Sequence, residues 1–222
     1  MKAPIVETQM DWDRLCDLAK APFAQRWIYG AAAARLGRTV QRQVVMNQSH
    51  PVALAQIVSR QVAGITVALT PNGPLFLSEV DKKSAVHSLK QTLPRFSIAI
   101  ATPQDQLRWL RLSRPITQCA LDLSQDIDHL HRGLHGKWRN ALRKAEKSYL
   151  KVAQTQPNSQ ALMPLLLAEK QRQSKGKYRA LPPEFTLALQ EVAPRSLRLF
   201  SACDTQMLFL THGNSATYHI GY

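Results

Sequence analysis

The same order of expected elements occurs twice in the sequence, and this repeat constrains the fold more than any other feature. Helices are expected where apolar residues recur every three or four positions, and strands where they alternate between turn residues. In the first copy a strand, two helices, three strands, a helix and a strand are expected at 3–8, 11–19, 23–36, 39–46, 53–61, 65–69, 82–93 and 96–101. Strands mixed with helices in this order predict an α/β (α+β) fold.

The second copy is expected to begin near residue 117. A strand and a long helical region are followed by two helices and three strands, at 118–123, 124–148, 161–174, 183–192, 196–203, 207–211 and 215–222. The long helical region contains Gly133 and Gly136, which can interrupt it. Its apolar stripe, which we expect to be buried, comprises Ile127, Leu130, Leu134, Trp138, Leu142 and Ala145.

The repeat divides the 222 residues into two expected domains, 1–115 and 116–222. The first copy continues past its three strands with a helix and a strand, whereas the second ends on an apolar strand. An uncovered apolar edge is unfavourable. We therefore expect the second domain to be truncated at its C-terminus, and the alternative is a natural end on an edge strand.

Positive charge is concentrated in one stretch of the sequence. The chain has 29 Lys and Arg against 15 Asp and Glu, and residues 131–179 alone contain twelve basic and two acidic residues. A positive electrostatic field concentrated in one stretch indicates a polyanionic partner, such as nucleic acid, a nucleotide-linked substrate or an anionic lipid head group. The alternative is a solvated helix face that keeps the protein soluble.

The cysteines and the N-terminus indicate the compartment. Cys16, Cys119 and Cys203 are odd in number and far apart, which fits neither a disulfide framework nor a zinc knuckle. The N-terminus reaches Asp11 without a signal-like apolar run, and no apolar run approaches a membrane span of roughly 20 residues. We expect a cytoplasmic protein.

Four short stretches resemble motifs of one known family. They are the segment Pro22 to Gly30, the turn Thr70-Pro71-Asn72-Gly73-Pro74, the basic segment Lys137 to Ser148 and the segment His212 to Tyr218. Together with the repeated element order, they resemble the Fem-type (FemA/FemB/FemX) peptidyltransferases, which consist of two tandem GNAT-like domains. Two positions differ: Ala33 stands where many members have Lys, and Asn72 where the family has Arg.

The resemblance implies transfer of an aminoacyl group from aminoacyl-tRNA to an amine of a peptidoglycan precursor, lipid-linked or nucleotide-linked, with possible contact to the membrane surface. No cofactor is implied. The alternatives are a coenzyme A-dependent N-acyltransferase of the same fold and a non-catalytic nucleic-acid-binding remnant. A coenzyme A pyrophosphate loop should follow the third strand, but prolines at 71 and 74 remove amide donors there, which argues against acetyl-CoA in the first domain.

The candidate substrate-binding residues come from these segments and from the basic stretch. They are Gln25, Trp27, Tyr29, Arg139, Arg143, Lys144, Lys147, Lys175, Arg179 and Tyr218. The basic ones suit phosphate, and Lys175 and Arg179 are expected in a mobile loop. For each, the alternative is a packing role or a solvated surface. His129, His131 and His135 lack a Cys or acidic ligand at a recognised spacing, so we expect no metal site, and we assign no catalytic residue.

Overall fold

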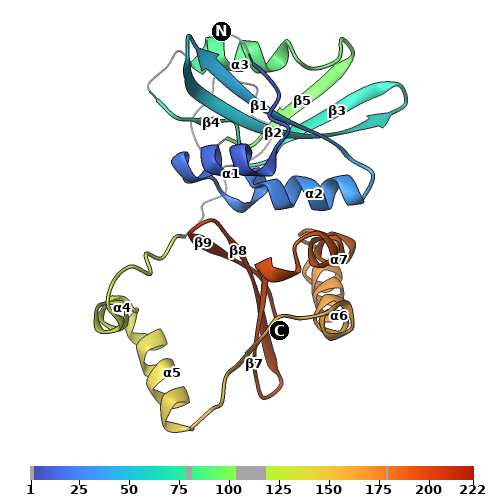
Figure 1. The fold of residues 1–222 in the computed structure, drawn as a ribbon. Helices are drawn as coiled ribbons and strands as arrows, with labels where there is room; N and C mark the ends of the chain where they lie inside the picture. The colour runs from blue at the N-terminus through green and yellow to red at the C-terminus, as the bar shows by residue number, and fades with distance from the viewer. Residues whose placement is uncertain (1–2, 79–81, 104–118, 179) are drawn as a thin grey trace.

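The structure is a computed structural model that describes residues 3–78, 82–103, 119–178 and 180–222. The elements are α1 (Gln9–Leu18), η1 (Phe23–Gln25), α2 (Trp27–Arg35), β1 (Thr39–Asn47), β2 (His50–Val62), β3 (Ile65–Thr70), β4 (Leu75–Phe76), α3 (Lys82–Lys90), β5 (Ser97–Ala101), α4 (Ile127–Gly133), α5 (Gly136–Lys147), β6 (Ala153–Thr155), α6 (Ser159–Gly176), α7 (Pro183–Val192), η2 (Pro194–Ser196), β7 (Leu197–Ala202), β8 (Thr205–His212) and β9 (Ser215–Gly221). They form two sheets, one above the other in Figure 1; α1 and α2 lie beneath the upper sheet, and α6 and α7 lie beside the lower one, with α7 nearer to α2. We call residues 3–103 the first half and 119–222 the second half.

Sheet A of the first half has the order β1-β2-β3-β5, with β4 beside β2. The strands β1, β2 and β3 form an antiparallel meander, and β5 pairs in parallel with β3. The strand expected at 3–8 is wrong: only Ile5 forms a bridge, with Gln43. Pro4 has no amide hydrogen to donate, and the segment makes only the two backbone bonds of this bridge with β1, from the Val6 amide to Arg42 and from the Val44 amide to Pro4.

Sheet B of the second half has the order β6-β7-β8-β9, and all its pairs are antiparallel. The strand expected at 118–123 is wrong for its described residues, 119–123, which form no strand. Instead, β6 pairs with β7, the first strand of the three-strand meander β7-β8-β9. It occupies the position that the bridging segment around Ile5 occupies beside β1 in sheet A. The second copy of the element order therefore runs β6-α6-α7-β7-β8-β9, and α4 and α5 precede it.

Three apolar clusters hold these layers together. One packs α3 on one face of sheet A, and another places Trp12 and Cys16 of α1 on the opposite face. The third is the core of the second half, with α6 and α7 on sheet B, and it also contains Phe23, Ala32 and Ala33 from the first half. This third cluster therefore spans both halves, and we call it the shared core.

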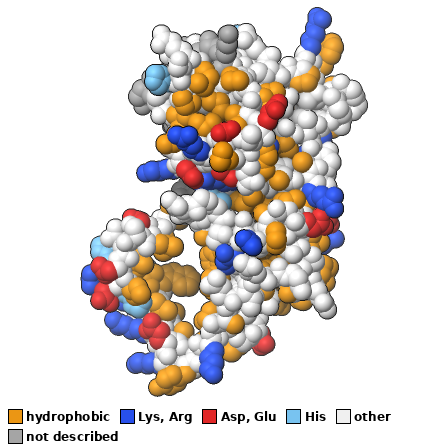
Figure 2. Space-filling model, in the orientation of Figure 1, with side chains coloured by type: hydrophobic (Ala, Val, Ile, Leu, Met, Phe, Trp, Pro, Cys, Tyr) orange, Lys and Arg blue, Asp and Glu red, His pale blue; other side chains and the backbone are white. Residues whose placement is uncertain are grey.

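The helices α4 and α5 form an arm that lies apart from the rest of the second half (Figure 1). Asp126 caps α4 and His135 caps α5, so the long helical region is broken at Leu134 and His135. The expected burial of its apolar stripe is wrong: neither helix has a buried residue, and Trp138 is 70% exposed. Figure 2 shows an opening between the arm and the body, with hydrophobic side chains along its walls.

Among the described residues, no helix is both long and apolar enough to cross a membrane.

Candidate functional site

A buried hydrogen-bond network joins two of the motif segments. Gln25, in η1, is fully buried; its Nε2 donates to the Pro71 carbonyl at 2.6 Å, and its Oε1 accepts from the Gln56 amide at 2.7 Å. The Gln56 Nε2 donates in turn to the carbonyls of Ala24 and Arg26. Both ends of the Gln25 amide are thus engaged, and the side chain positions the entry to α2 against the turn after β3.

Arg42 of β1 completes this network. Its Nε donates to Gln56 Oε1 at 2.8 Å, and its guanidinium lies 3.5 Å from the ring centroid of Trp27. Burial lowers the pKa of Arg42 to about 10, so the side chain keeps its charge near neutral pH. A Cβ at Gly30 would lie under 3.0 Å from the side chains of Gln56 and Arg42, which explains why glycine occupies that position.

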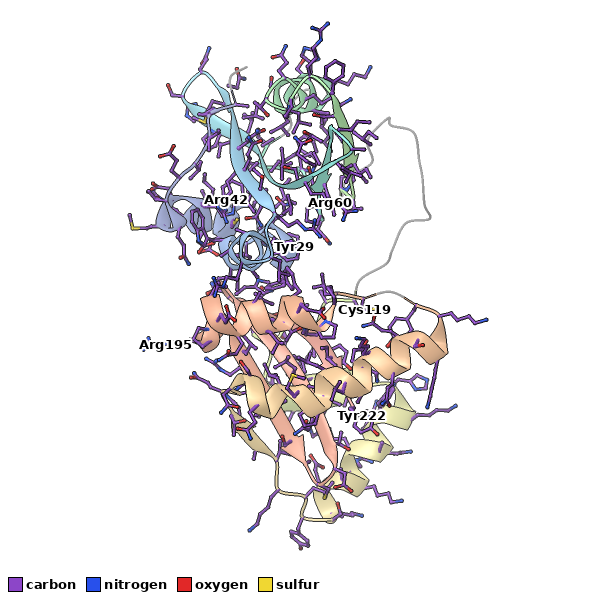
Figure 3. The ribbon with its side chains drawn as sticks, turned by 90° about the vertical axis from the view of Figure 1, so that its right-hand side faces the viewer. Tyr29, Arg42, Arg60, Cys119, Arg195 and Tyr222 are labelled. Atoms are coloured by element: carbon purple, nitrogen blue, oxygen red, sulfur yellow. The ribbon has the colours of Figure 1, made fainter. Side chains whose placement is uncertain are left out.

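Tyr29 lies where the two halves meet (Figure 3). Its ring is 4.9 Å from that of Phe185 in α7 and 5.7 Å from that of Phe23, measured between centroids. Burial raises the pKa of the Tyr29 hydroxyl. Gln25, Trp27 and Tyr29 are therefore engaged in packing and internal hydrogen bonds. The turn after β3 packs closely against Gln25, because a Cβ at Gly73 would lie under 3.0 Å from the Gln25 side-chain amide.

The basic side chains of α5 divide into two groups. Arg139 turns back along the arm, and its Nη2 donates to the carbonyls of Arg132 and Leu134 at 3.0 and 2.9 Å, which ties the two helices together. Arg143, Lys144 and Lys147 are exposed, and within the described part of the chain they make no hydrogen bond or ion pair. These three remain available to an anionic partner, whereas Arg139 is occupied.

The chain around Lys175 and Tyr178, which was expected to be a mobile loop, is ordered by helix α6 and by side-chain hydrogen bonds. Lys175 lies exposed in the last turn of α6, and Arg179 lies outside the described residues. Between them, the Tyr178 hydroxyl donates to Glu169 Oε1 at 2.9 Å, and Arg172 also bonds to Glu169. Burial would raise the pKa of Glu169, but hydrogen bonds from Arg172, Tyr178 and Gln173 lower it below its usual value.

Tyr218 and His219 face opposite sides of sheet B, as alternation along β9 predicts. Tyr218 is 54% exposed and packs edge-on against Phe209, with ring centroids 5.7 Å apart. Phe209 makes a similar contact with Phe200. His219 faces the helices, where its Nε2 lies 2.8 Å from the hydroxyl of Thr186 in α7. Of the candidate residues in sheet B, Tyr218 is the accessible one.

A pocket of about 280 Å³ opens at the junction of the halves. Its lining residues are Asp13, Asp17, Arg26, Ile28, Ser196, Thr211, His212 and Gly213. Arg26 is 4% exposed and pairs with Asp17 at 2.5 Å, and Thr217 is the hydrogen-bond partner of His212 Nε2. Sequence reasoning assigned no function to these residues, because the pocket joins positions nearly 200 residues apart and only the pairing of an arginine with acidic residues on α1 could have indicated it.

Two histidines that pack inside the fold, the buried His212 and the half-buried His219, make the stability of the fold depend on pH. Burial lowers the pKa of His212 to about 4, with Arg26 adding to the effect, and burial lowers that of His219 to about 4 against the opposing charge of Glu169. The unfolded chain binds these protons near pH 6.5, so their stabilising effect is present above pH 6.5 and is lost as the pH falls to about 4.

We expect the free energy of unfolding to fall by about 2 to 4 kcal/mol between pH 7 and pH 4.5 because of these two groups. Urea unfolding at each pH measures it. His219→Gln should flatten the pH dependence, while His50→Gln, at an exposed position, should leave it unchanged. A pH dependence that is equally steep in the wild type and in His219→Gln would contradict the assignment.

Among the described residues, no three His, Cys, Asp or Glu side chains gather to hold a metal ion. His131 lies 3.9 Å from Glu146, and His135 caps α5. The histidines of the arm therefore have local contacts of their own.

Comparison with solved structures identifies the fold. A crystal structure of FemX aligns with 95% of this chain at a TM-score of 0.65 and 14% sequence identity. The chain has the fold of FemX over the aligned residues. It spans 58% of the length of that FemX chain. The structure of a GCN5-related N-acetyltransferase from Kribbella flavida aligns with the whole chain and 59% of its own, at 13% identity, but its TM-score of 0.35 adds nothing to the argument.

Sequence comparisons add no assignment, since no protein-family model and no curated protein matches this sequence.

Proposed function

We propose that this chain belongs to an acyltransferase of the Fem type, which transfers an aminoacyl group from aminoacyl-tRNA to an amine of a peptidoglycan precursor. The observation that carries the proposal is the alignment of 95% of the chain with FemX. The helix-helix-meander unit occurs twice in this chain, as expected for tandem GNAT-like domains. Because the chain spans 58% of FemX, the activity is proposed for the protein of which this fold is a part.

The reaction requires that the enzyme position the amine against the ester carbonyl, and it needs no covalent nucleophile on the protein. A neutral amine attacks the ester carbonyl of the aminoacyl group, the new amide bond forms, and the ribose hydroxyl leaves with a proton. Both proposed substrates carry phosphates. Arg143, Lys144 and Lys147 are exposed cations near the C-terminal end of α5, and in this proposal they bind the phosphates and supply electrostatic RNA affinity.

The acyl group arrives on the tRNA in this proposal, so no separate cofactor is needed. A coenzyme A pyrophosphate binds to successive backbone amides after the third strand of a GNAT-like meander. In this chain, Pro71 and Pro74 of that turn have no amide hydrogen, and the Asn72 amide donates to the Thr102 hydroxyl at 2.8 Å. These contacts support aminoacyl-tRNA over coenzyme A as the donor.

The proposal is tested with the triple variant Arg143→Glu, Lys144→Glu, Lys147→Glu. We expect its affinity for aminoacyl-tRNA to fall by more than about tenfold at moderate salt, and the salt dependence of binding to weaken, because three phosphate contacts are lost. Fluorescence anisotropy with labelled aminoacyl-tRNA measures both. Arg139 is excluded from the variant because it links α4 to α5.

The matched control reverses three exposed arginines elsewhere: Arg14→Glu, Arg60→Glu and Arg195→Glu. Its net charge changes by the same amount, so an equal loss of affinity would show that binding follows net charge and would reject the role of α5. Transfer of a labelled amino acid to an amine-bearing precursor tests the reaction itself. Stabilisation by acetyl-CoA in place of aminoacyl-tRNA would favour a coenzyme A-dependent enzyme, and RNA binding without a precursor effect would favour a non-catalytic RNA-binding protein.

A further inference from the structure

The connection between α5 and β6 is the most exposed apolar segment of the arm. Tyr149 is 90% exposed, Val152 is 64% exposed and Leu150 is 47% exposed. Lys151 lies among them and is also exposed. We call residues 149–152 the tip. In Figure 1 the tip is at the lower end of the molecule, and Figure 2 shows hydrophobic and basic side chains together at that end.

Tyr149 occupies its place at a conformational cost. It follows the C-cap Ser148 and has a φ of 52°, the left-handed conformation that glycine usually provides after a helix. A bulky side chain at positive φ is uncommon. A Tyr149 that is 90% exposed gains little from packing, so the fold itself does not account for tyrosine at this position.

The charges near the tip all favour an anionic partner. Lys144 and Lys147 lie in the last turn of α5, Lys151 lies within the tip, and Glu146 is the sole acidic residue in 131–151. Tyrosine and aliphatic side chains flanked by lysines are the combination that binds the interface of an anionic bilayer: the rings and aliphatic groups enter the head-group region, and the lysines contact lipid phosphates. RNA would use the lysines but would not need Leu150 or Val152.

We propose that the tip binds the surface of a membrane rich in anionic phospholipid, by shallow insertion of Tyr149, Leu150 and Val152. This goes beyond the proposed acyl transfer and does not depend on it. The lysines orient the arm toward the lipid phosphates, and the apolar side chains supply the part of the binding free energy that salt does not screen.

Vesicle co-sedimentation of the full chain tests the inference. We expect binding to vesicles of phosphatidylglycerol and phosphatidylcholine and little binding to phosphatidylcholine alone. Tyr149→Gly with Leu150→Ser should weaken binding to the anionic vesicles by about tenfold, because two interfacial apolar groups are lost. Tyr149→Gly alone should weaken it less while leaving the melting temperature unchanged or raised, since glycine suits the backbone there.

The matched control is Phe96→Gly with Met10→Ser, at apolar positions 72% and 78% exposed in the first half. It should bind vesicles as the wild type does. The inference is overturned if the tip variant and wild type bind the anionic vesicles equally, or if the control loses as much binding as the tip variant. Anisotropy with aminoacyl-tRNA separates this result from the proposed function: the tip variant should keep its RNA affinity, and a parallel loss of RNA binding would identify the tip as part of an RNA surface and reject the bilayer.

Discussion

Replacing Gln56 with leucine should lower the free energy of unfolding by about 3 to 5 kcal/mol, the largest effect we expect from a single side chain. Gln56 is fully buried and its amide serves three partners: the carbonyls of Ala24 and Arg26, and the guanidinium of Arg42. Leucine has a similar volume but no polar group. The two carbonyls and a mostly buried charge would lose their hydrogen bonds, and no water can easily replace them.

The matched control is Gln61→Leu, the same change on the same strand. Gln61 is exposed and bonds only to the Thr66 hydroxyl, at 2.8 Å. We expect the free energy of unfolding of this control to differ from that of the wild type by no more than about 0.5 kcal/mol. Chemical denaturation followed by circular dichroism measures both variants. Equal stabilities of the two variants would show that the network around Gln56 is dispensable.

Leu189→Ala should lower the free energy of unfolding by about 3 kcal/mol, because it leaves a cavity in the shared core. Leu189 is fully buried in α7, within the cluster that also contains Ala32 and Ala33 of α2. The lost methyl groups would weaken packing within the second half and its contact with the first half together. Limited proteolysis is the second measurement, and we expect faster cleavage in both halves.

Leu167→Ala provides the comparison, since this leucine of α6 is 53% exposed. This substitution should lower the free energy of unfolding by less than about 1 kcal/mol. If Leu189→Ala accelerated proteolysis in the second half alone, the two halves would be independent units, and the shared core would not couple them.

The sequence predicted the two meanders well, for a physical reason. The strands are short runs of mostly apolar residues, and turn-forming pairs such as Ala63-Gly64 and Gly213-Asn214 separate them. The observed strands β1, β2 and β3 begin and end within three residues of the expected bounds. The helices α6 and α7 were also predicted, because their apolar spacing is regular. Such short-range patterns do not depend on the rest of the fold.

The arm was predicted less well, because periodicity reveals an apolar face but not what covers that face. The stripe around Trp138 has helical spacing, yet Ile127 and Trp138 are exposed and its other residues are only half-buried. Arg139 was grouped with the other basic residues of its helix as a phosphate ligand. In the structure it instead donates to the carbonyls of Arg132 and Leu134 at the end of the neighbouring helix. Backbone acceptors leave no mark in a sequence.

The candidate site shows the same limit. The sequence placed Gln25 near a ligand because its motif resembles a family segment, but burial and hydrogen bonding decide what a glutamine does. Its partners are a backbone carbonyl at Pro71 and a backbone amide at Gln56, 46 and 31 residues away. The pocket that contains Arg26 and His212 joins the two halves, and its second-half residues could not be linked by any local pattern to Arg26 and the acidic residues of α1.

The contact between α2 and α7 has a consequence for how such a chain could arise. Each is the second helix of its copy of the repeated unit, so at this contact the two copies touch through equivalent helices. A contact between equivalent surfaces is self-complementary, which is the arrangement of a two-fold symmetric dimer. In this chain the covalent connection holds the two equivalent helices together at any protein concentration, which separate chains would not do.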